Sequence, residues 1–298
     1  WSSDVCSSDL DAAHAAADAW GKTSVQARSN VLLAIADRIE SRLEMLALTE
    51  TWDNGKPIRE TLNADLPLAV DHFRYFAGCL RAQEGTAAEI DQNTVAYHIY
   101  EPLGVVGQII PWNFPLLMAA WKLAPALAGG NCVVLKPAEQ TPLGISVLME
   151  EIGDLLPPGV LNVLFGRGAS VGDRLTGHDK VRMVSLTGSI ATGEHIIAHT
   201  AAGIKRTHME LGGKAPVLVF DDADLDAAVA GAVASKYRNA GQTCVCTNRF
   251  LVQDGVYDAF AAKLKAAVAK LKVGNGLDEG VTIGPLINPD AVEKVREH

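Results

Sequence analysis

The sequence predicts an α/β fold, a doubly wound parallel sheet with helices covering both of its faces. Short apolar runs alternate along the chain with helical segments, and each run is too uniformly apolar to keep one face in water. Strands that are buried on both faces and separated by helices form parallel sheets with right-handed crossovers. Such sheets bind ligands beyond the carboxyl ends of their strands, so the polar residues after each run are the first candidates for a site.

The N-terminal part is expected to be a leader followed by a helix. Residues 1–10 have neither the basic nor the apolar region of a secretory signal, and their near-repeat of Ser-Ser-Asp differs from the pattern of the remaining chain. We expect them to be a non-native or unstructured leader outside the fold. From Ser24 apolar residues recur at three- and four-residue steps, which predicts an amphipathic helix that Gly55 and Pro57 end. These apolar residues are Leu32, Ile35, Ile39, Leu43 and Leu46.

The elements after Gly85 follow one another as strands and helices. Residues 94–100 alternate and carry β-branched and aromatic side chains, which predicts a half-exposed strand, and residues 104–110 predict a buried one. Further buried strands are expected at residues 132–135, 161–165, 183–186 and 216–220. Helices are expected near residues 142–156, 170–176, 192–202, 224–238 and 254–271.

The composition argues against several classes of function. Asp and Glu total 35 against 26 Lys and Arg, and no basic run stands out, so no nucleic-acid partner is expected. The longest apolar runs, such as residues 116–120, are far shorter than the roughly 20 residues of a membrane helix. The 5 cysteines are irregularly spaced, which favours a reducing, cytoplasmic location over a disulfide framework. Without a CxxC or HExxH pattern, no metal site is expected.

Two glycine-containing turns are candidates for phosphate binding. The spacing of Gly166, Gly168 and Gly172 misses the dinucleotide pattern GxGxxG by one residue, and a plain turn before a helix explains it equally well. The second turn, residues 188–193, follows an expected strand and is rich in small residues. Such residues let the amides at a helix N-terminus approach a phosphate, but this spacing alone is only suggestive.

Four segments at strand ends or helix breaks become specific when they are taken together. They are Pro111-Trp-Asn-Phe-Pro115, Lys136-Pro-Ala-Glu139, Met209-Glu-Leu-Gly-Gly-Lys214 and Gly241-Gln-Thr-Cys244. In this set and order the chain resembles the NAD(P)-dependent aldehyde dehydrogenase superfamily, from about Asp11 to His298.

The resemblance implies a domain organisation. Residues 11–85 and 104–240 would form the NAD-binding domain, with residues 86–103 as a β extension that joins subunits into a homo-oligomer. Residues 241–298 would be the N-terminal part of a second, catalytic α/β domain. Relatives are considerably longer, so the chain is expected to be truncated and, in isolation, aggregation-prone or weakly active.

The resemblance also implies three catalytic residues. Cys244 would be the nucleophile that attacks the aldehyde carbon, and Asn113 would donate its amide N–H to the oxyanion. Glu210 would activate the water that hydrolyses the thioester, helped by an apolar setting that raises its pKa. Taken alone, each has a simpler interpretation: an inert cysteine, a turn asparagine and a salt-bridge glutamate. Cys246 better fits the inert role.

The cofactor positions are implied in the same way. Lys136 and Glu139 would hold the adenosine ribose hydroxyls, and because a carboxylate repels a 2′-phosphate, NAD is favoured over NADP. Ser189 would contact the pyrophosphate. The remaining positions expected to line the cofactor are Ile110, Pro111, Trp112, Gly166, Gly168, Gly188, Thr192, Gly193 and Leu211.

The substrate is expected to be a small-molecule aldehyde. Phe114, Met118 and Trp121 share one face of a helix and would line the aldehyde tunnel, although such a stripe is as often plain core. Relatives that oxidise succinate semialdehyde carry an arginine at the position of Trp121, so a carboxylate-bearing substrate is disfavoured. The resemblance is mosaic: residues 11–141 resemble acetaldehyde, 165–220 γ-aminobutyraldehyde, and 237–285 succinate-semialdehyde dehydrogenases.

The sequence therefore predicts oxidation of an aliphatic or ω-amino aldehyde to its acid with NAD. Within enzymes, the alternatives are succinate-semialdehyde oxidation and a CoA-acylating or phosphorylating reductase on the same fold. Retention of Glu210 argues against such reductases, which need no water-activating base. An inactive fragment or a non-catalytic structural relative is the alternative from another class.

Overall fold

The computed structural model describes residues 3–297, and its main sheet has five parallel strands in the order β5-β4-β3-β6-β7. The strands are β3 (Val105–Ile109), β4 (Cys132–Lys136), β5 (Leu161–Val163), β6 (Val181–Thr187) and β7 (Arg206–Glu210). From β3 the chain crosses outward to β4 and β5, then returns past β3 to β6 and β7. This is the doubly wound order that the sequence predicts.

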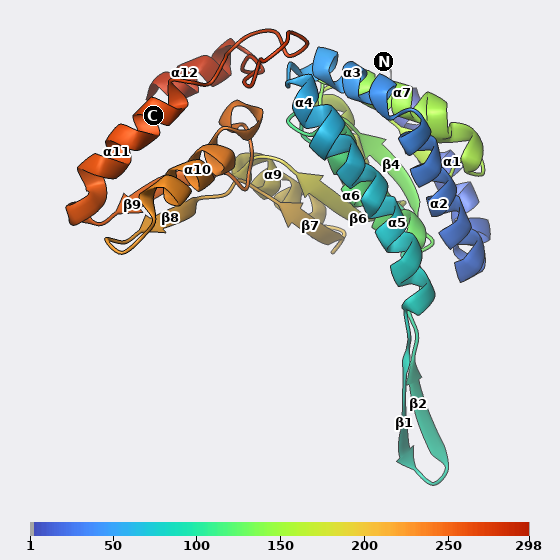
Figure 1. The fold of residues 1–298 in the computed structure, drawn as a ribbon. Helices are drawn as coiled ribbons and strands as arrows, with labels where there is room; N and C mark the ends of the chain where they lie inside the picture. Colours follow the sequence, from blue (N-terminus) through green and yellow to red (C-terminus); the bar gives the residue numbers. More distant parts are fainter. Residues whose placement is uncertain (1–2, 298) are drawn as a thin grey trace.

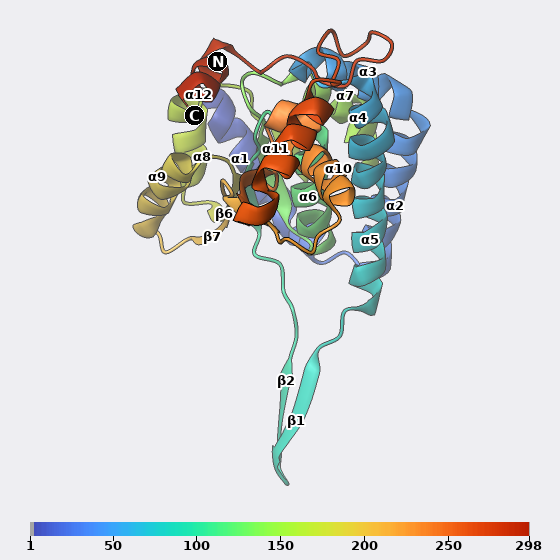
Figure 2. The same ribbon diagram turned by 60° about the vertical axis from the view of Figure 1, so that its left-hand side comes forward.

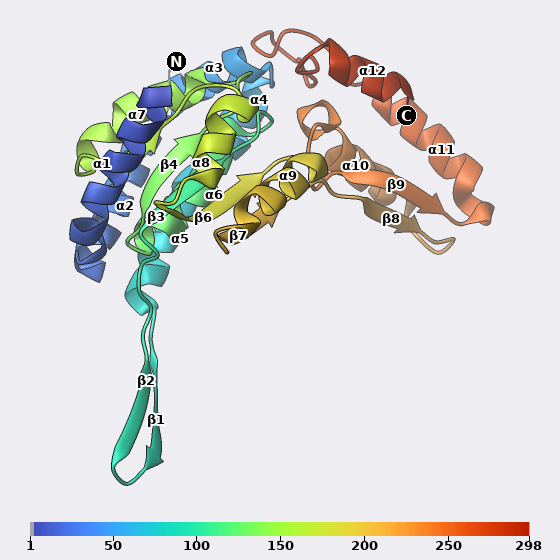
Figure 3. The same ribbon diagram turned by 180° about the vertical axis from the view of Figure 1, so that it is seen from behind.

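The crossover helices cover both faces of this sheet, as Figures 1 and 3 show from opposite sides. They are α6 (Pro115–Ala128), α7 (Leu143–Ile152), α8 (Asp173–Gly177) and α9 (Ile190–Ala201). Neighbouring residues of β3 mark the two faces. The Gln108 side chain donates to the Lys122 carbonyl of α6, at 2.7 Å, whereas a Cβ on Gly107 would lie 3.1 Å from Leu175 of α8. The core therefore lies on both sides of β3.

The expected leader is part of the fold, which corrects the prediction for residues 3–10; residues 1 and 2 lie outside the described range. They begin helix α1 (Ser3–Gly21), which packs against β3, β4 and β5. Cys6 and Leu10 are buried, and Asp11 pairs with Lys180. Cys6, Leu10, Ala13 and Trp20 share one face at helical spacing, so a helical period was present among the serines and aspartates.

The segment expected as one helix from Ser24 is two helices, α2 (Val25–Ser41) and α3 (Leu43–Asn54), separated at Arg42. Ser24 caps α2, and Gly55 ends α3 with a left-handed φ of 81°. A short α4 (Ile58–Glu60) and a π-helical segment η1 (Thr61–Asp65) lead into α5 (Leu66–Ala82), which packs with α2 against α6.

A hairpin of β1 (Thr86–Asp91) and β2 (Thr94–His98) projects from the end of α5. All residues of both strands are exposed, so the half-exposed strand expected at residues 94–100 has neither face covered in this chain. Figure 2 shows the hairpin extending away from the helices and sheets.

A second unit begins earlier than expected. Strand β8 (Ala215–Val219) pairs with β9 (Thr247–Val252) and not with the main sheet, and α10 (Leu225–Lys236) packs on α11 (Asp254–Val268). Val219, Val229, Ala232 and Phe260 form its own small core. The boundary predicted at residue 240 is therefore wrong, because β7 ends the main sheet and Gly212 and Gly213 lead the chain into the next one.

The remaining helical segments are η2 (Gly153–Leu155), η3 (Gly168–Gly172), η4 (Arg238–Gly241) and α12 (Pro289–Glu297). Among residues 3–297, no helix is long and apolar enough to cross a membrane.

Candidate active site at the carboxyl ends of the strands

Cys244 lies on an exposed loop, which begins where the chain reverses direction tightly after α10. Asn239, Ala240 and Gly241 have φ values of 50°, 55° and 80°, so three consecutive left-handed residues turn the chain after α10. The next residues carry Cys244 into solvent, while Cys246 is buried and only 4% exposed. The loop also packs closely on the main chain after β7, since a Cβ on Gly213 would overlap the Cys244 carbonyl.

Asn113 is tied to the same loop. Its side-chain Nδ2 donates to the Gln242 carbonyl at 2.9 Å, two residues before Cys244. Its own carbonyl accepts from the side-chain amides of Asn54 and Asn239, at 3.1 and 2.9 Å. An amide carries two N–H groups, so one donor remains for a further partner, and the buried Oδ1 has no partner. The fold therefore brings Asn113 and the Cys244 loop together.

Glu210 ends β7, the edge strand of the main sheet. Its carbonyl accepts from the Gly188 N–H at 2.9 Å, and its side chain is 63% exposed. The apolar setting expected for this carboxylate is therefore not found, because within residues 3–297 no further strand pairs with the outer edge of β7. Its Oε1 lies 3.5 Å from Nε2 of His208 on the same strand.

Lys136 and Glu139 meet beyond the end of β4. The Lys136 ammonium is almost fully buried and donates to the Pro137 carbonyl at 3.0 Å and to Glu139 Oε1 at 3.4 Å. Burial lowers the pKa of Lys136, and the Glu139 carboxylate opposes that shift. Glu139 Oε1 also accepts from the Gly168 N–H at 2.7 Å, so the glycine turn and the ion pair form one surface.

The N-terminus of α9 faces the same end of the sheet. Ser189 caps it by accepting from the Thr192 N–H at 3.1 Å. A Cβ on Gly193 would lie 2.8 Å from Leu211, so a glycine is needed for the chain after Glu210 to pass α9 closely. Gly166 has a φ of 147°, and a Cβ there would lie 2.6 Å from Val171.

These groups fit a dinucleotide. A helix N-terminus offers N–H groups and a positive dipole end to a pyrophosphate, and a lysine beside a carboxylate can bind ribose hydroxyls. Gly166 and Gly193 let these turns pack tightly on Val171 and Leu211, whereas no atom lies within 4 Å of the position of a Cβ on Gly168. Ile110, Pro111, Trp112 and Gly188 lie at the ends of β3 and β6, beside the point where the strand order reverses.

Comparison with known proteins decides the family. The model of the aldehyde dehydrogenase family matches residues 3–298. An acetaldehyde dehydrogenase from Pseudomonas aeruginosa is 60% identical over 96% of this chain and 58% of its own length. The chain belongs to the aldehyde dehydrogenase family. This family is NAD(P)-dependent and acts on aldehydes, which confirms the family and the cofactor class that the four segments predict.

Solved aldehyde dehydrogenases share the fold. An enzyme from Brucella melitensis is 43% identical, with a TM-score of 0.97, and the match covers 100% of this chain and 62% of that one. A betaine aldehyde dehydrogenase from Staphylococcus aureus solved with NAD+ is 39% identical, with a TM-score of 0.96 over 99% and 59% of the two chains. The α/β fold class is thus confirmed, and the chain spans about three fifths of these relatives.

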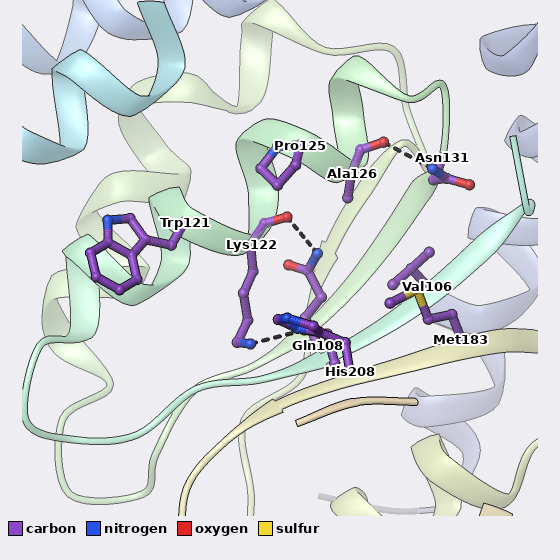
Figure 4. A pocket seen from close by; sticks show the side chains of 10 residues that line it. Val106, Gln108, Trp121, Lys122, Pro125, Ala126, Asn131, Met183 and His208 are labelled. Atoms are coloured by element: carbon purple, nitrogen blue, oxygen red, sulfur yellow. Dashed lines mark hydrogen bonds between the residues drawn. The ribbon is translucent and has the colours of Figure 1, made fainter. Parts of the chain in front are cut away.

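The residues expected to line the aldehyde tunnel have three different surroundings. Phe114 is buried beneath two cations, with Lys56 Nζ 3.7 Å and the Arg238 guanidinium 4.8 Å from its ring centre. Met118 is buried, whereas Trp121 is 43% exposed and stacks on His72 at 5.2 Å. Trp121 also borders a cavity of about 300 Å³ between α6 and strands β3 and β6 (Figure 4). Their role in an aldehyde tunnel stays a prediction.

The cavity contains polar side chains that the sequence analysis missed. Lys122, only 6% exposed, donates to Ser185 Oγ at 2.9 Å, and Ser185 Oγ lies 3.1 Å from His208 Nδ1. Burial lowers the pKa of Lys122 to about 8, against a smaller opposing effect of the Glu210 carboxylate. A lysine within the apolar helix segment, and the polar Gln108 and Ser185 within buried strands, were the available signals.

Replacing Lys122 by methionine is expected to change the pH dependence of stability. The unfolded lysine has its ordinary pKa of 10.5, so between about pH 8 and that value the unfolded chain binds a proton that the folded chain does not. Stability of the wild type should therefore rise by about 1.4 kcal/mol per pH unit relative to the Lys122→Met variant. Urea unfolding across this range measures the difference. Parallel curves for the two proteins would contradict it, and exposed Lys294→Met is the control.

Proposed function

We propose that this chain carries the residues for oxidising an aliphatic or ω-amino aldehyde to its carboxylic acid with NAD. The hydrogen bond from the Asn113 side chain to the Gln242 carbonyl is the main support. It joins an oxyanion donor from the end of β3 to the loop that bears an exposed thiol, although more than a hundred residues separate them in sequence. A nucleophile beside a neutral N–H donor suits attack on a carbonyl carbon.

In the proposed reaction, the Cys244 thiolate attacks the aldehyde carbon and forms a thiohemiacetal. The free N–H of Asn113 Nδ2 stabilises the negative oxygen as it develops, without adding a charge of its own. Bound NAD+ would supply the hydride acceptor that converts this adduct into a thioester. Lys136, Glu139 and Ser189 are the residues proposed to hold the cofactor.

Glu210 is proposed to complete the cycle. Its carboxylate takes a proton from water, the resulting hydroxide attacks the thioester carbonyl, and the Cys244 thiolate leaves as the acid is released. Its position supports this role, because Leu211 links it to Gly193 of α9, and Gly213 packs against the Cys244 carbonyl. The carboxylate thus lies on a segment that joins the proposed cofactor helix to the nucleophile loop.

The direct test is cofactor reduction by the 298-residue chain with acetaldehyde, γ-aminobutyraldehyde and succinate semialdehyde, each with NAD and with NADP. We expect NADH formation with the first two aldehydes, because Trp121 offers no cation for a distal carboxylate. We also expect a preference for NAD, because the Glu139 carboxylate would repel a 2′-phosphate. NADH binding, measured through NADH fluorescence, distinguishes a failure of cofactor binding from a failure of the reaction at Cys244. A chain that neither binds NADH nor reacts at Cys244 with any aldehyde would contradict the proposal.

The Glu210→Gln variant is expected to separate the two halves of the reaction. Each site should still release one NADH in a burst, whereas steady-state turnover should fall about 100-fold, the range of a lost general base. Mass spectrometry should then find an acyl group on Cys244. Exposed Glu194→Gln on α9 is the matched control and should behave as wild type. Equal steady-state rates for Glu210→Gln and wild type would exclude the glutamate as the base.

We also propose that the β1–β2 hairpin joins subunits of a homo-oligomer in the cytoplasm. Its strands expose every residue, and the apolar side chains of Val95 and Tyr97 on β2 and of Ile99 just after it are exposed. Sedimentation of the chain with and without the hairpin tests the assembly.

A further inference from the structure

A series of polar side chains links the buried Lys122 of α6 to Glu210. Lys122 on α6, Ser185 on β6 and His208 on β7 follow one another at 2.9 and 3.1 Å, and His208 Nε2 lies 3.5 Å from Glu210 Oε1. In Figure 4 the Lys122 and His208 side chains point toward one another across the cavity. The contacts thus form a continuous path from a buried amine to the exposed carboxylate.

The hydrogen-bonding capacity of each group determines the direction of this path. A lysine ammonium only donates, so Ser185 Oγ accepts from Lys122 and turns its own hydroxyl hydrogen toward His208 Nδ1. Nδ1 is then the acceptor, which leaves the imidazole proton on Nε2. That N–H faces the Glu210 carboxylate. The 3.5 Å separation is long for a hydrogen bond, as is common for catalytic pairs before substrate binds.

The other groups around the cavity do not compete for this path. Among the described residues that line it, Lys122 and His208 are the titratable ones, and Glu210 faces His208 from the same strand. Gln108 donates to the Lys122 carbonyl, and its Oε1 has no hydrogen-bond partner. Neither Gln108 nor Trp121 contributes a charge. The protonation state of Lys122 is therefore the main variable that can reverse the direction of the chain.

We propose that His208 is a positioning residue for Glu210 and, with Ser185, passes the proton that Glu210 takes from water to Lys122. With Lys122 neutral, Ser185 donates to Nζ, His208 Nδ1–H donates to Ser185, and Nε2 accepts from protonated Glu210. Moving one proton along each of these bonds leaves ionised Glu210, the Nε2–H form of His208 and an ammonium on Lys122. No proton is gained or lost in these transfers. The Lys122 ammonium then releases its proton to solvent through the open cavity. The inference rests on the proposed role of Glu210.

Burial supports the choice of Lys122 as the proton acceptor. The low exposure of its side chain brings the pKa down to about 8, so near neutral pH the amine can both lose and regain a proton. A solvent-exposed lysine would stay protonated and would hold the chain in one direction.

The histidine tautomer tests the inference without turnover. Nitrogen-15 spectra of the whole chain labelled at histidine, with His208 assigned through His208→Gln, should show the Nε2–H tautomer at neutral pH. Ser185→Ala and Lys122→Met should each abolish that preference, whereas the exposed His14→Gln should leave it unchanged. An Nδ1–H tautomer in the wild type, or a tautomer that neither variant alters, would overturn the inference.

Kinetics distinguish this inference from the proposed function. His208→Leu and Ser185→Ala should keep the NADH burst and lose about 10-fold in steady-state turnover, with a reduced solvent isotope effect on that step. If Glu210→Gln itself leaves turnover unchanged, the proposed function fails. If Glu210→Gln slows turnover but both other variants turn over as wild type, the proposed function stands and the relay is wrong.

Discussion

Replacing Cys244 by alanine is expected to lower aldehyde-dependent NADH formation by about 10³-fold or more, because the exposed thiol beside Asn113 that would form the thiohemiacetal is lost. Cofactor binding should be unaffected, since Lys136, Glu139 and Ser189 lie on other segments of the chain. Initial rates of NADH formation measure the loss, and NADH fluorescence titration measures the binding.

Cys246→Ala is the matched control for this substitution. Cys246 lies two residues further on, is buried, and has its sulfur 3.4 Å from the Gly241 carbonyl. We expect the variant to keep the activity of the wild type. Iodoacetamide should label Cys244 first, because it is the exposed member of the pair. Equal activity of wild type and Cys244→Ala would contradict the assignment of the nucleophile.

Replacing Lys56 by methionine is expected to destabilise the fold by about 3–5 kcal/mol, the usual cost of removing one partner of a buried ion pair. Lys56 is fully buried, and its Nζ lies 3.4 Å from Glu50 Oε1 and 2.5 Å from Asp65 Oδ2. Without the ammonium, the buried Glu50 carboxyl would lose its cationic partner, and Asp65 would keep Arg238 alone. Burial already raises the pKa of Glu50 to about 7. Urea unfolding at neutral pH measures the change.

The matched control is a Lys–Asp ion pair that is exposed to solvent on the protein surface. Asp18 on α1 and Lys22 just after its end are 2.7 Å apart, with both side chains more than 70% exposed, so Lys22→Met should leave the unfolding curve unchanged. A Lys56→Met protein as stable as the wild type would show that the buried cluster is not an ion pair in solution.

The buried cluster also reaches the candidate site. Asp65 accepts from Arg238 at 2.8 Å, and Glu60 accepts from the Asn239 N–H at 2.9 Å. Arg238 and Asn239 begin the turn that exposes Cys244. We therefore expect loss of Lys56 to loosen the nucleophile loop as well as the helices, so Cys244 alkylation rates report a second effect of the same substitution.

Local pattern predicted the main sheet well. The buried runs at residues 104–110, 132–135, 161–165 and 183–186 correspond to β3, β4, β5 and β6, because uniformly apolar segments between helices have few alternatives to a parallel sheet. Strand β7 was not predicted, since its residues are mostly exposed at the sheet edge and include Arg206 and His208. The strand at residues 216–220 was predicted but assigned to the wrong sheet.

The candidate site was predicted through short motifs whose residues then prove to share one edge of the sheet. Asn113, Lys136, Ser189 and Glu210 each follow or end a strand, so the parallel arrangement gathers them without any contact being visible in the sequence. The Lys122–Ser185–His208 path was missed because its members come from three elements, and none belongs to a motif.

By itself, the sequence determined the family, the doubly wound sheet and the identity of the candidate catalytic and cofactor residues, because these depend on local apolar pattern and on short motifs. Only the tertiary structure decided which polar groups meet. It ties Asn113 to the Cys244 loop, leaves Glu210 exposed on an edge strand, and buries Lys56 and Lys122 among specific partners. The physical reason is that burial and hydrogen bonding between distant segments depend on packing, which a linear pattern does not contain.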